Sequence, residues 1–186
     1  MPDASSDFTG NTNDYIQVST NSVEEGNYIW RKTNVPFRVD ASSHISIKNN
    51  TNVTIEPGVR FDFGTNSQLS VNTGCSLKAI GTSTEPIIFS GVDGAAGAWK
   101  GLEFSFTQSI NNQLDNCVIE YAGSDTEDAA IYMWAEPKLS VTNCIIRDVD
   151  GCAFVDGTGT HLGFDNPNFS QSGNTFENVS GGVECI

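Results

Sequence analysis

Long hydrophobic runs are absent from this sequence. Hydrophobic residues make up 38% of the chain, but they occur in pairs and triplets, and no run approaches the ~20 residues that cross a bilayer. We therefore expect no transmembrane segment. Met1 is followed by PDASSDFTGNTND, which has neither the basic start nor the apolar stretch of a signal peptide.

That polar opening predicts a flexible tether over residues 1–14. Such a tether is typical of the segment that follows a cleaved signal or a lipid-anchored cysteine. We therefore expect an exported protein, either secreted or displayed on the outer cell surface, with a lipid anchor in a longer parent as one form of display.

Positive charge is scarce. The chain has 9 Lys and Arg residues against 23 Asp and Glu residues, which gives a formal net charge of -14. Such a surface repels phosphate groups, so nucleic acid and anionic membranes are poor partners. The same surface is compatible with cations and with neutral sugars.

Common catalytic and metal-binding motifs are missing as well. No C-x-x-C pair is present, which disfavours a zinc site. The two histidines, His44 and His161, lie in different regions, and no Ser/His/Asp or Cys/His nucleophilic motif accompanies them. Regular Thr-x-Thr ladders, which an ice-binding face would need, are also absent.

What the sequence does contain is an internal repeat. One repeated motif occurs twice, as NCVIEYAGS at residues 116–124 and as NCIIRDVDG at residues 143–151, and related stretches precede both copies. Each stretch reads as a strand, a turn with Gly or Asn, and a second strand, with the spacing by two that strands require. Little or no α-helix is expected.

Aligning the second strands predicts three columns of side chains. The inward column should be a vertical file, and the next residue of each strand should point outward. The inward apolar column contains Phe61, Leu77, Leu102, Ile119 and Ile146. The outward charged column contains Asp62, Lys78, Glu103, Glu120 and Arg147. Two positions before the apolar residues stand Val59, Cys75, Lys100, Cys117 and Cys144.

The stretch NVTIEPGVRFDFGTNSQLSVNTGCSLKAIGTSTEPIIFSG, with WKGLEFSF and LDNCVIEYAG, resembles the parallel β-helix repeat proteins of bacterial surfaces in the pectate-lyase-like superfamily. The likeness is close over residues 45–147 and loose over 148–186. It implies a single-stranded right-handed parallel β-helix of about six rungs over residues 15–186, with residues 15–44 as its N-terminal cap. It implies little about function, because this architecture carries lyases, hydrolases, adhesins and spacers.

The C-terminal stretch NTFENVSGGVECI looks like one more rung that stops abruptly. Either a longer parent has been cut there, or that end meets another chain through self-association. The sequence leaves both interpretations open.

The outward charged column supplies the candidate catalytic residues. Neighbouring rungs lie about 4.8 Å apart, so Glu103 and Glu120 are expected to form a carboxylate pair flanked by Arg147 and Lys100. Such a pair can serve acid/base chemistry or bind a Ca²⁺ ion. The simpler interpretation is a solvated charge ladder without catalysis and without a cofactor, and we favour it.

An insertion, SDTEDAAIYMWAEPK, supplies the candidate ligand-binding residues. Exposed aromatic rings offer flat faces to sugar rings, and carboxylates accept hydrogen bonds from hydroxyl groups. AAIYMW also reads as an ordinary strand, with either Ile131 and Met133 or Tyr132 and Trp134 facing the core. The candidates are Asp125, Glu127, Asp128, Tyr132 and Trp134, together with Trp99 from the preceding insertion.

The five cysteines are expected to be mainly buried, stacked free thiols, with a disulfide involving Cys152 or Cys185 as the alternative. Lys100 interrupts the column of cysteines, and we expect the adjacent insertion to shift the register so that Lys100 reaches water.

These observations predict a non-catalytic, surface-displayed β-helix module that binds carbohydrate or acts in adhesion or scaffolding. The expected partner is a polysaccharide or a cell-surface glycan. The alternative is a polysaccharide lyase or glycoside hydrolase that acts through Glu103 and Glu120 with Lys100 or Arg147.

Overall fold

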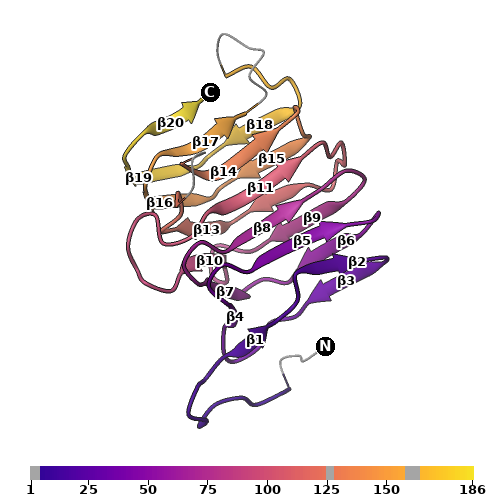
Figure 1. Cartoon of the computed structure of the whole chain (residues 1–186), viewed down its shortest axis with the longest axis vertical. Helices are drawn as coiled ribbons and strands as arrows, with labels where there is room; N and C mark the ends of the chain where they lie inside the picture. The colour runs from indigo at the N-terminus through magenta and orange to yellow at the C-terminus, as the bar shows by residue number, and fades with distance from the viewer. Residues whose placement is uncertain (1–4, 125–127, 158–163) are drawn as a thin grey trace.

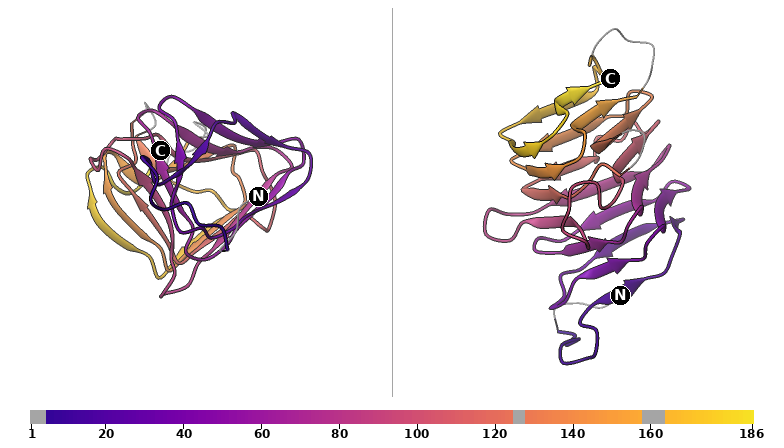
Figure 2. Two further views of the ribbon diagram at one scale, coloured as in Figure 1. Left: turned by 90° about the horizontal axis from the view of Figure 1, so that it is seen from below. Right: turned by 60° about the vertical axis from the view of Figure 1, so that its left-hand side comes forward.

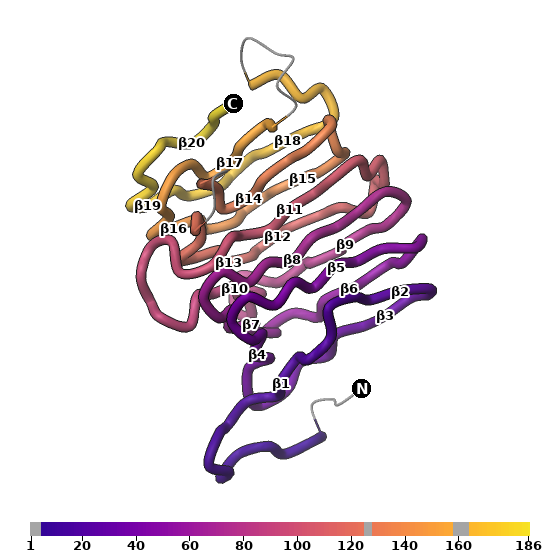
Figure 3. Tube along the Cα trace, in the orientation of Figure 1, coloured from indigo at the N-terminus to yellow at the C-terminus, as the bar shows by residue number. Residues whose placement is uncertain are grey.

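The computed structural model describes residues 5–124, 128–157 and 164–186, and over these residues the chain forms a parallel β-solenoid (Figure 1). Every regular element in these ranges is a strand, and the chain visits three parallel sheets in turn. Viewed from below, the sheets surround one interior (Figure 2). The chain climbs through about six turns from the N-terminus to the C-terminus (Figure 3). The predicted all-β solenoid is confirmed.

Sheet 1 is held by a file of inward side chains on successive turns. The rings of Phe37, Phe61 and Phe89 stack, with neighbouring centroids 5.4 and 5.8 Å apart. The register continues this buried file to Ile119 and Ile146. Large apolar side chains suit a pleated surface that is buried on one face. The strands of sheet 1, in spatial order, are β1 (Ile16–Val18), β4 (Phe37–Val39), β7 (Arg60–Phe63), β10 (Ile87–Gly91), β13 (Cys117–Glu120), β16 (Ile145–Val149) and β19 (Thr175–Val179).

Sheet 2 has an equivalent inward file, and it also carries the outer face discussed below. Ile45, Leu69, Leu102, Ile131 and Phe154 are buried neighbours in register. Burying each of these side chains contributes about 1.5–3 kcal/mol relative to leaving it exposed. The strands of sheet 2, in spatial order, are β2 (Ser22–Glu24), β5 (His44–Lys48), β8 (Gln68–Val71), β11 (Gly101–Ser105), β14 (Ala129–Trp134), β17 (Cys152–Asp156) and β20 (Gly182–Cys185).

Sheet 3 closes the interior. Its inward file runs from Trp30 through Ile55, Ala79 and Leu114 to Val141, all of them buried. The small Ala79 lies between larger residues, so the side chains of one file differ in size along the axis. The strands of sheet 3, in spatial order, are β18 (Phe169–Ser172), β15 (Leu139–Thr142), β12 (Gln113–Asp115), β9 (Ser76–Ile80), β6 (Asn52–Ile55) and β3 (Asn27–Trp30).

The predicted single apolar file is wrong in its register. Phe61, Ile119 and Ile146 do share sheet 1, but Leu77 lies in β9 of sheet 3 and Leu102 lies in β11 of sheet 2. All five side chains are buried, as expected. The error arises because a turn contains three strands rather than two, and strands of every sheet show the same alternation of buried and exposed residues.

The segment predicted as a cap, residues 15–44, supplies β1, β2 and β3, which begin the three sheets. It therefore forms the first turn of the coil. Residues 5–14, within the predicted tether, form no strand, but Asn34 accepts a hydrogen bond from the Phe8 N–H (3.2 Å) and donates one to Asp7 (2.7 Å).

The cysteines divide into two groups. Cys75, Cys117 and Cys144 are buried free thiols, and Cys152 forms a disulfide with Cys185. Cys117 and Cys144 stack at one corner, where the Cys117 N–H lies 3.4 Å from the Cys144 sulfur. The hydrogen bond between the two thiols, followed by burial, raises the pKa of Cys117, and the same hydrogen bond lowers the pKa of Cys144. Cys75 lies at another corner of the coil, so the three thiols do not form one column.

Candidate functional site

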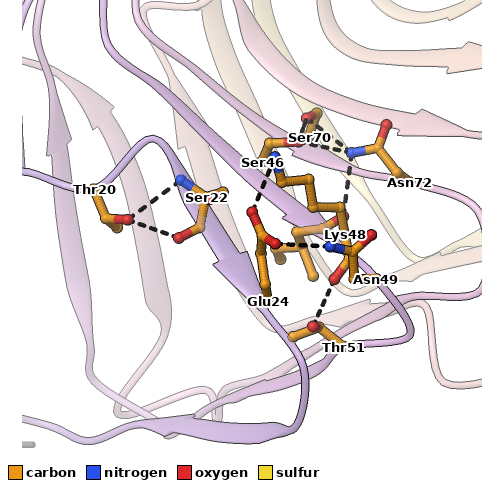
Figure 4. Close-up of polar contacts among 10 residues, drawn as sticks. Thr20, Ser22, Glu24, Ser46, Lys48, Asn49, Thr51, Ser70 and Asn72 are labelled. Atoms are coloured by element: carbon orange, nitrogen blue, oxygen red, sulfur yellow. Dashed lines mark hydrogen bonds and ion pairs between the residues drawn. The ribbon is translucent and has the colours of Figure 1, made fainter.

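The outer face of sheet 2 begins, at its N-terminal end, as a network of short polar side chains (Figure 4). Asn72 donates a hydrogen bond of 2.9 Å to the Ser46 hydroxyl and one of 3.4 Å to the Ser70 hydroxyl. Glu24 binds Lys48 at 3.0 Å and accepts a hydrogen bond of 2.7 Å from Asn49. These side chains therefore form hydrogen bonds and an ion pair with one another across neighbouring turns.

Farther along the same face, the polar columns change to aromatic residues. The register places Glu103 beside Tyr132 and Ser105 beside Trp134. In β14, Ile131 and Met133 are buried, and Tyr132 and Trp134 point outward. Of the two orientations left open by the sequence, the structure therefore has the aromatic pair on the outer face.

The two aromatic rings of β14 lie nearly parallel. The centroids of Tyr132 and Trp134 are 6.4 Å apart, and their planes differ by 22°. Trp134 is 39% exposed, whereas Tyr132 is half-buried. A Cβ atom at Gly157 would lie 2.1 Å from the Tyr132 hydroxyl oxygen, so glycine at this position makes room for the ring. The pair thus presents an exposed Trp134 ring beside a half-buried Tyr132 ring on one strand.

A hollow of about 510 Å³ lies beside this pair. Asp128, at the start of β14, contributes a carboxylate to its wall, and the Cys152 to Cys185 disulfide lies at its edge. Three glycines also line the hollow. The lining residues are Asp128, Tyr132, Gly151, Cys152, Val155, Gly157, Gly181, Cys185 and Ile186. Two predicted ligand-binding residues, Asp128 and Tyr132, therefore meet at one surface depression next to a third, Trp134.

The prediction that Trp99 lies exposed on a binding loop is wrong. Trp99 is completely buried, and its ring stacks on Phe63 with centroids 4.1 Å apart and planes within 9° of parallel. Its indole N–H donates a hydrogen bond of 2.9 Å to the Glu120 carbonyl oxygen. A large apolar ring with one satisfied polar atom is a favourable core residue, and the insertion folds inward because of it.

Two further predicted ligand-binding residues, Asp125 and Glu127, lie outside the residues that the structure describes, as does His161.

The predicted carboxylate pair of Glu103 and Glu120 is not formed. Glu103 lies in β11 of sheet 2 and Glu120 lies in β13 of sheet 1, so they belong to different faces of the coil. Lys78 belongs to sheet 3. Only Asp62, Glu120 and Arg147 of the predicted charged column share a face, with Ser90 between the two carboxylates.

Glu120 is instead the centre of a closed network on sheet 1. Its side chain is 7% exposed, and its Oε2 atom accepts hydrogen bonds from Arg147 Nε at 2.8 Å and Arg147 Nη2 at 2.5 Å. The Ser90 hydroxyl donates to Oε1 at 2.8 Å, and Arg60 approaches that oxygen at 4.0 Å. The hydrogen bond with Glu120 raises the pKa of Arg147. A carboxylate with both oxygens satisfied is a structural ion-pair partner rather than an exposed acid or base.

Lys100 is half-buried just before β11, and its backbone N–H donates to the Ser67 carbonyl oxygen at 2.9 Å. Lys100 was expected to interrupt a column of cysteines and to reach water through a shift in register. Its side chain is partly exposed, and no single cysteine column exists for it to interrupt. Sequence reasoning missed a contact nearby, since His44 Nε2 lies 2.8 Å from the Ser70 hydroxyl oxygen. Burial lowers the pKa of His44, and the positive charge of Lys100 lowers it further. His44 and Ser70 are 26 positions apart and lie on adjacent turns, so this contact could not be predicted without the number of residues in a turn.

Within the described parts of the chain, no group of three or more His, Cys, Asp or Glu side chains is arranged to hold a metal ion. The same residues include no helix that is long and apolar enough to span a membrane. Comparison with known proteins found no matching family model, no similar curated protein and no similar solved structure. The fold defines the class of the protein, a parallel β-solenoid, and the resemblance to bacterial pectate-lyase-like proteins stays a prediction.

Proposed function

We propose that the protein is a non-catalytic β-solenoid module that binds carbohydrate through the outer face of sheet 2. The observation that carries this proposal is the pair of outward rings, the exposed Trp134 and the half-buried Tyr132, beside a hollow that Asp128 lines. Sugar rings stack on aromatic faces, and their hydroxyl groups donate hydrogen bonds to carboxylates.

The charge of the chain narrows the ligand class. A formal net charge of -14 disfavours strongly anionic polysaccharides, because they would be repelled over the whole surface. A neutral glycan meets no such repulsion and gains from stacking and hydrogen bonding. The proposed ligand is therefore a neutral polysaccharide or a neutral cell-surface glycan.

We further propose that the protein acts outside the cytoplasm, secreted or displayed on a cell surface in an adhesive or scaffolding role. The Cys152 to Cys185 disulfide supports this location, because disulfides persist mainly in oxidising compartments. A stack of three continuous sheets is a rigid support on which a binding face can be held away from an anchor.

The alternative of a polysaccharide lyase or glycoside hydrolase loses its proposed acid/base pair, since Glu103 and Glu120 lie on different sheets. Arg147 is engaged with Glu120 and Lys100 lies near sheet 2, so the four candidates do not converge on one cleft. No described observation favours catalysis over binding.

The test is retention of the protein on an array of immobilised neutral and acidic glycans, followed by calorimetric titration with the neutral glycans that retain it. Trp134→Ala should weaken binding about two- to tenfold, because one stacking contact is worth roughly 0.5–1.5 kcal/mol. Ile29→Ala is the matched control, since Ile29 is 41% exposed on sheet 3 and its loss should leave affinity unchanged.

Two results would contradict the proposal. One is a wild-type protein that no neutral glycan retains. The other is release of reducing ends or unsaturated products during incubation with a polysaccharide, which would indicate an enzyme.

A further inference from the structure

Phe106 has an unusual backbone conformation for a residue of its size. It follows β11 at the corner between sheets 2 and 3, and its φ angle is 55°, in the left-handed region. Bulky side chains rarely adopt this region, because the Cβ atom then approaches the following carbonyl oxygen. Despite this cost, Phe106 is 55% exposed, so burial compensates for only part of it.

Several other turns meet the same requirement with residues better suited to it, although Glu25 (φ of 57°) is left-handed at this corner of the first turn. On the second and third turns, this corner has Asn49 and Asn50 (φ of 58° and 57°) and Gly74 (φ of 74°). Asn and Gly adopt the left-handed region at little cost. On the following turn, Ala135 (φ of 59°) and Glu136 (φ of 49°) both have this conformation, and neither is aromatic. Phe106 is thus the one large aromatic residue among the described left-handed positions of this corner.

The loop that carries Phe106 is firmly attached. The Phe106 N–H donates a hydrogen bond of 3.0 Å to the Trp134 carbonyl oxygen on the next turn. The next residue, Thr107, is fully buried, and its hydroxyl donates to the Cys75 carbonyl oxygen at 2.6 Å. Gln108 donates to the Glu136 carbonyl oxygen at 2.9 Å. The phenylalanine is therefore presented to solvent from a fixed backbone rather than from a loose loop.

A strained and exposed residue that the surrounding structure holds in place is a reason to look for a function. We infer that Phe106 is a third aromatic contact of the proposed carbohydrate site, and that the ligand is a neutral glycan chain of several sugar rings. The chain runs from the Tyr132 and Trp134 pair to the adjacent corner. This inference rests on the proposed function, and it adds the length of the ligand and a residue that determines it.

The neighbourhood of Phe106 agrees with a neutral, partly apolar ligand. Trp134 on the next turn and Ile110 in the same loop are also exposed, at 39% and 70%. The backbone hydrogen bond between Phe106 and Trp134 places these two residues on adjacent turns, so one glycan chain can span both. Longer chains therefore gain contacts that a short sugar cannot make.

The decisive variant is Phe106→Gly, because glycine relieves the backbone conformation while it removes the ring. We expect its melting temperature to rise, since a left-handed position favours glycine. We expect the dissociation constant for a neutral hexasaccharide to increase about five- to tenfold. Binding of the matching disaccharide should not change, because it occupies only the Tyr132 and Trp134 pair.

Phe106→Asn is the second variant, which replaces the ring by a polar side chain suited to the same conformation, and Ile29→Ala is the control. The sugars are the neutral glycans that bind wild-type protein in the array. Wild-type protein that binds no glycan overturns both the proposed function and this inference. Wild-type binding with unchanged hexasaccharide affinity in both Phe106 variants overturns this inference alone. A lower melting temperature in both variants would show that Phe106 is retained for packing, and it would also overturn the inference.

Discussion

The outer faces of sheets 1 and 2 have the same parallel strand geometry but different outward side chains. On sheet 1, side chains of opposite charge follow one another in register, and Glu120 has both oxygens satisfied by Arg147 and Ser90. On sheet 2, the polar network of the first turns gives way to Tyr132 and Trp134, beside a hollow that remains open. The difference indicates that charge on sheet 1 stabilises the coil, whereas the exposed aromatic residues of sheet 2 belong to the proposed binding surface.

The largest expected effect concerns the covalent link of sheet 2. The Cys152 to Cys185 disulfide joins β17 to β20 and closes a segment with a sequence separation of 33. Loop-closure entropy predicts that its loss lowers the free energy of unfolding by about 3–4 kcal/mol. Cys185→Ser and Cys152→Ser should show the same loss in chemical denaturation, and hydrogen exchange should accelerate most in β20.

The matched control for this prediction is Cys75→Ala, which removes a buried free thiol elsewhere in the coil. Its unfolding should respond to dithiothreitol as wild-type unfolding does, because the disulfide is intact. If dithiothreitol leaves the stability of wild-type protein unchanged, the disulfide does not hold the last turn.

The next largest effect compares the ion pairs of the two faces. Arg147→Ala leaves the nearly buried carboxylate of Glu120 without its main partner. We expect a loss of about 2–3 kcal/mol, between the values for exposed and fully buried pairs. Lys48→Ala breaks the exposed pair with Glu24 on sheet 2, and its loss should stay below about 1 kcal/mol. Equal losses in urea denaturation would remove the proposed distinction between the faces.

The sequence was sufficient to predict the solenoid, because the alternation of buried and exposed residues and the repeated turn residues are local properties. It was insufficient to predict the register. Leu77 and Leu102 have the same local pattern as Phe61, although they lie in other sheets. Only the pairing between strands far apart in the sequence shows to which sheet each residue belongs. For this reason Glu103 and Glu120 were predicted to be neighbours, although they lie on different sheets.

The candidate site was predicted only in part, because only the residues that are close together in the sequence could be assigned to it. Asp128, Tyr132 and Trp134 lie on one strand and its start, and the structure brings them together at the hollow. Trp99 was included because it lies in the preceding insertion, yet its ring is buried against Phe63. Phe106 was not predicted as a site residue. The sequence indicates a left-handed backbone conformation only where the residue is Gly or Asn, and Phe106 is neither.

The smallest expected effect is a pH dependence that arises on sheet 2. Burial and then the charge of Lys100 lower the pKa of His44 below its usual value near 6.5. Because the unfolded chain binds this proton more tightly, the contribution of His44 to stability is complete above about pH 6.5. It is lost as the pH falls through the lowered pKa of the folded state.

The measurement is the melting temperature of wild-type protein and of His44→Gln at about pH 7.5 and about pH 5. Acidification also changes the charge of other groups, so only the difference between the two proteins reports on His44. The wild type should lose slightly more than the variant on acidification. The sheet 1 variant Ser90→Ala serves as the comparison, because it removes a hydroxyl contact to Glu120 and keeps His44. If His44→Gln and wild type lose equal amounts, the contact between His44 and Ser70 does not depend on the neutral imidazole.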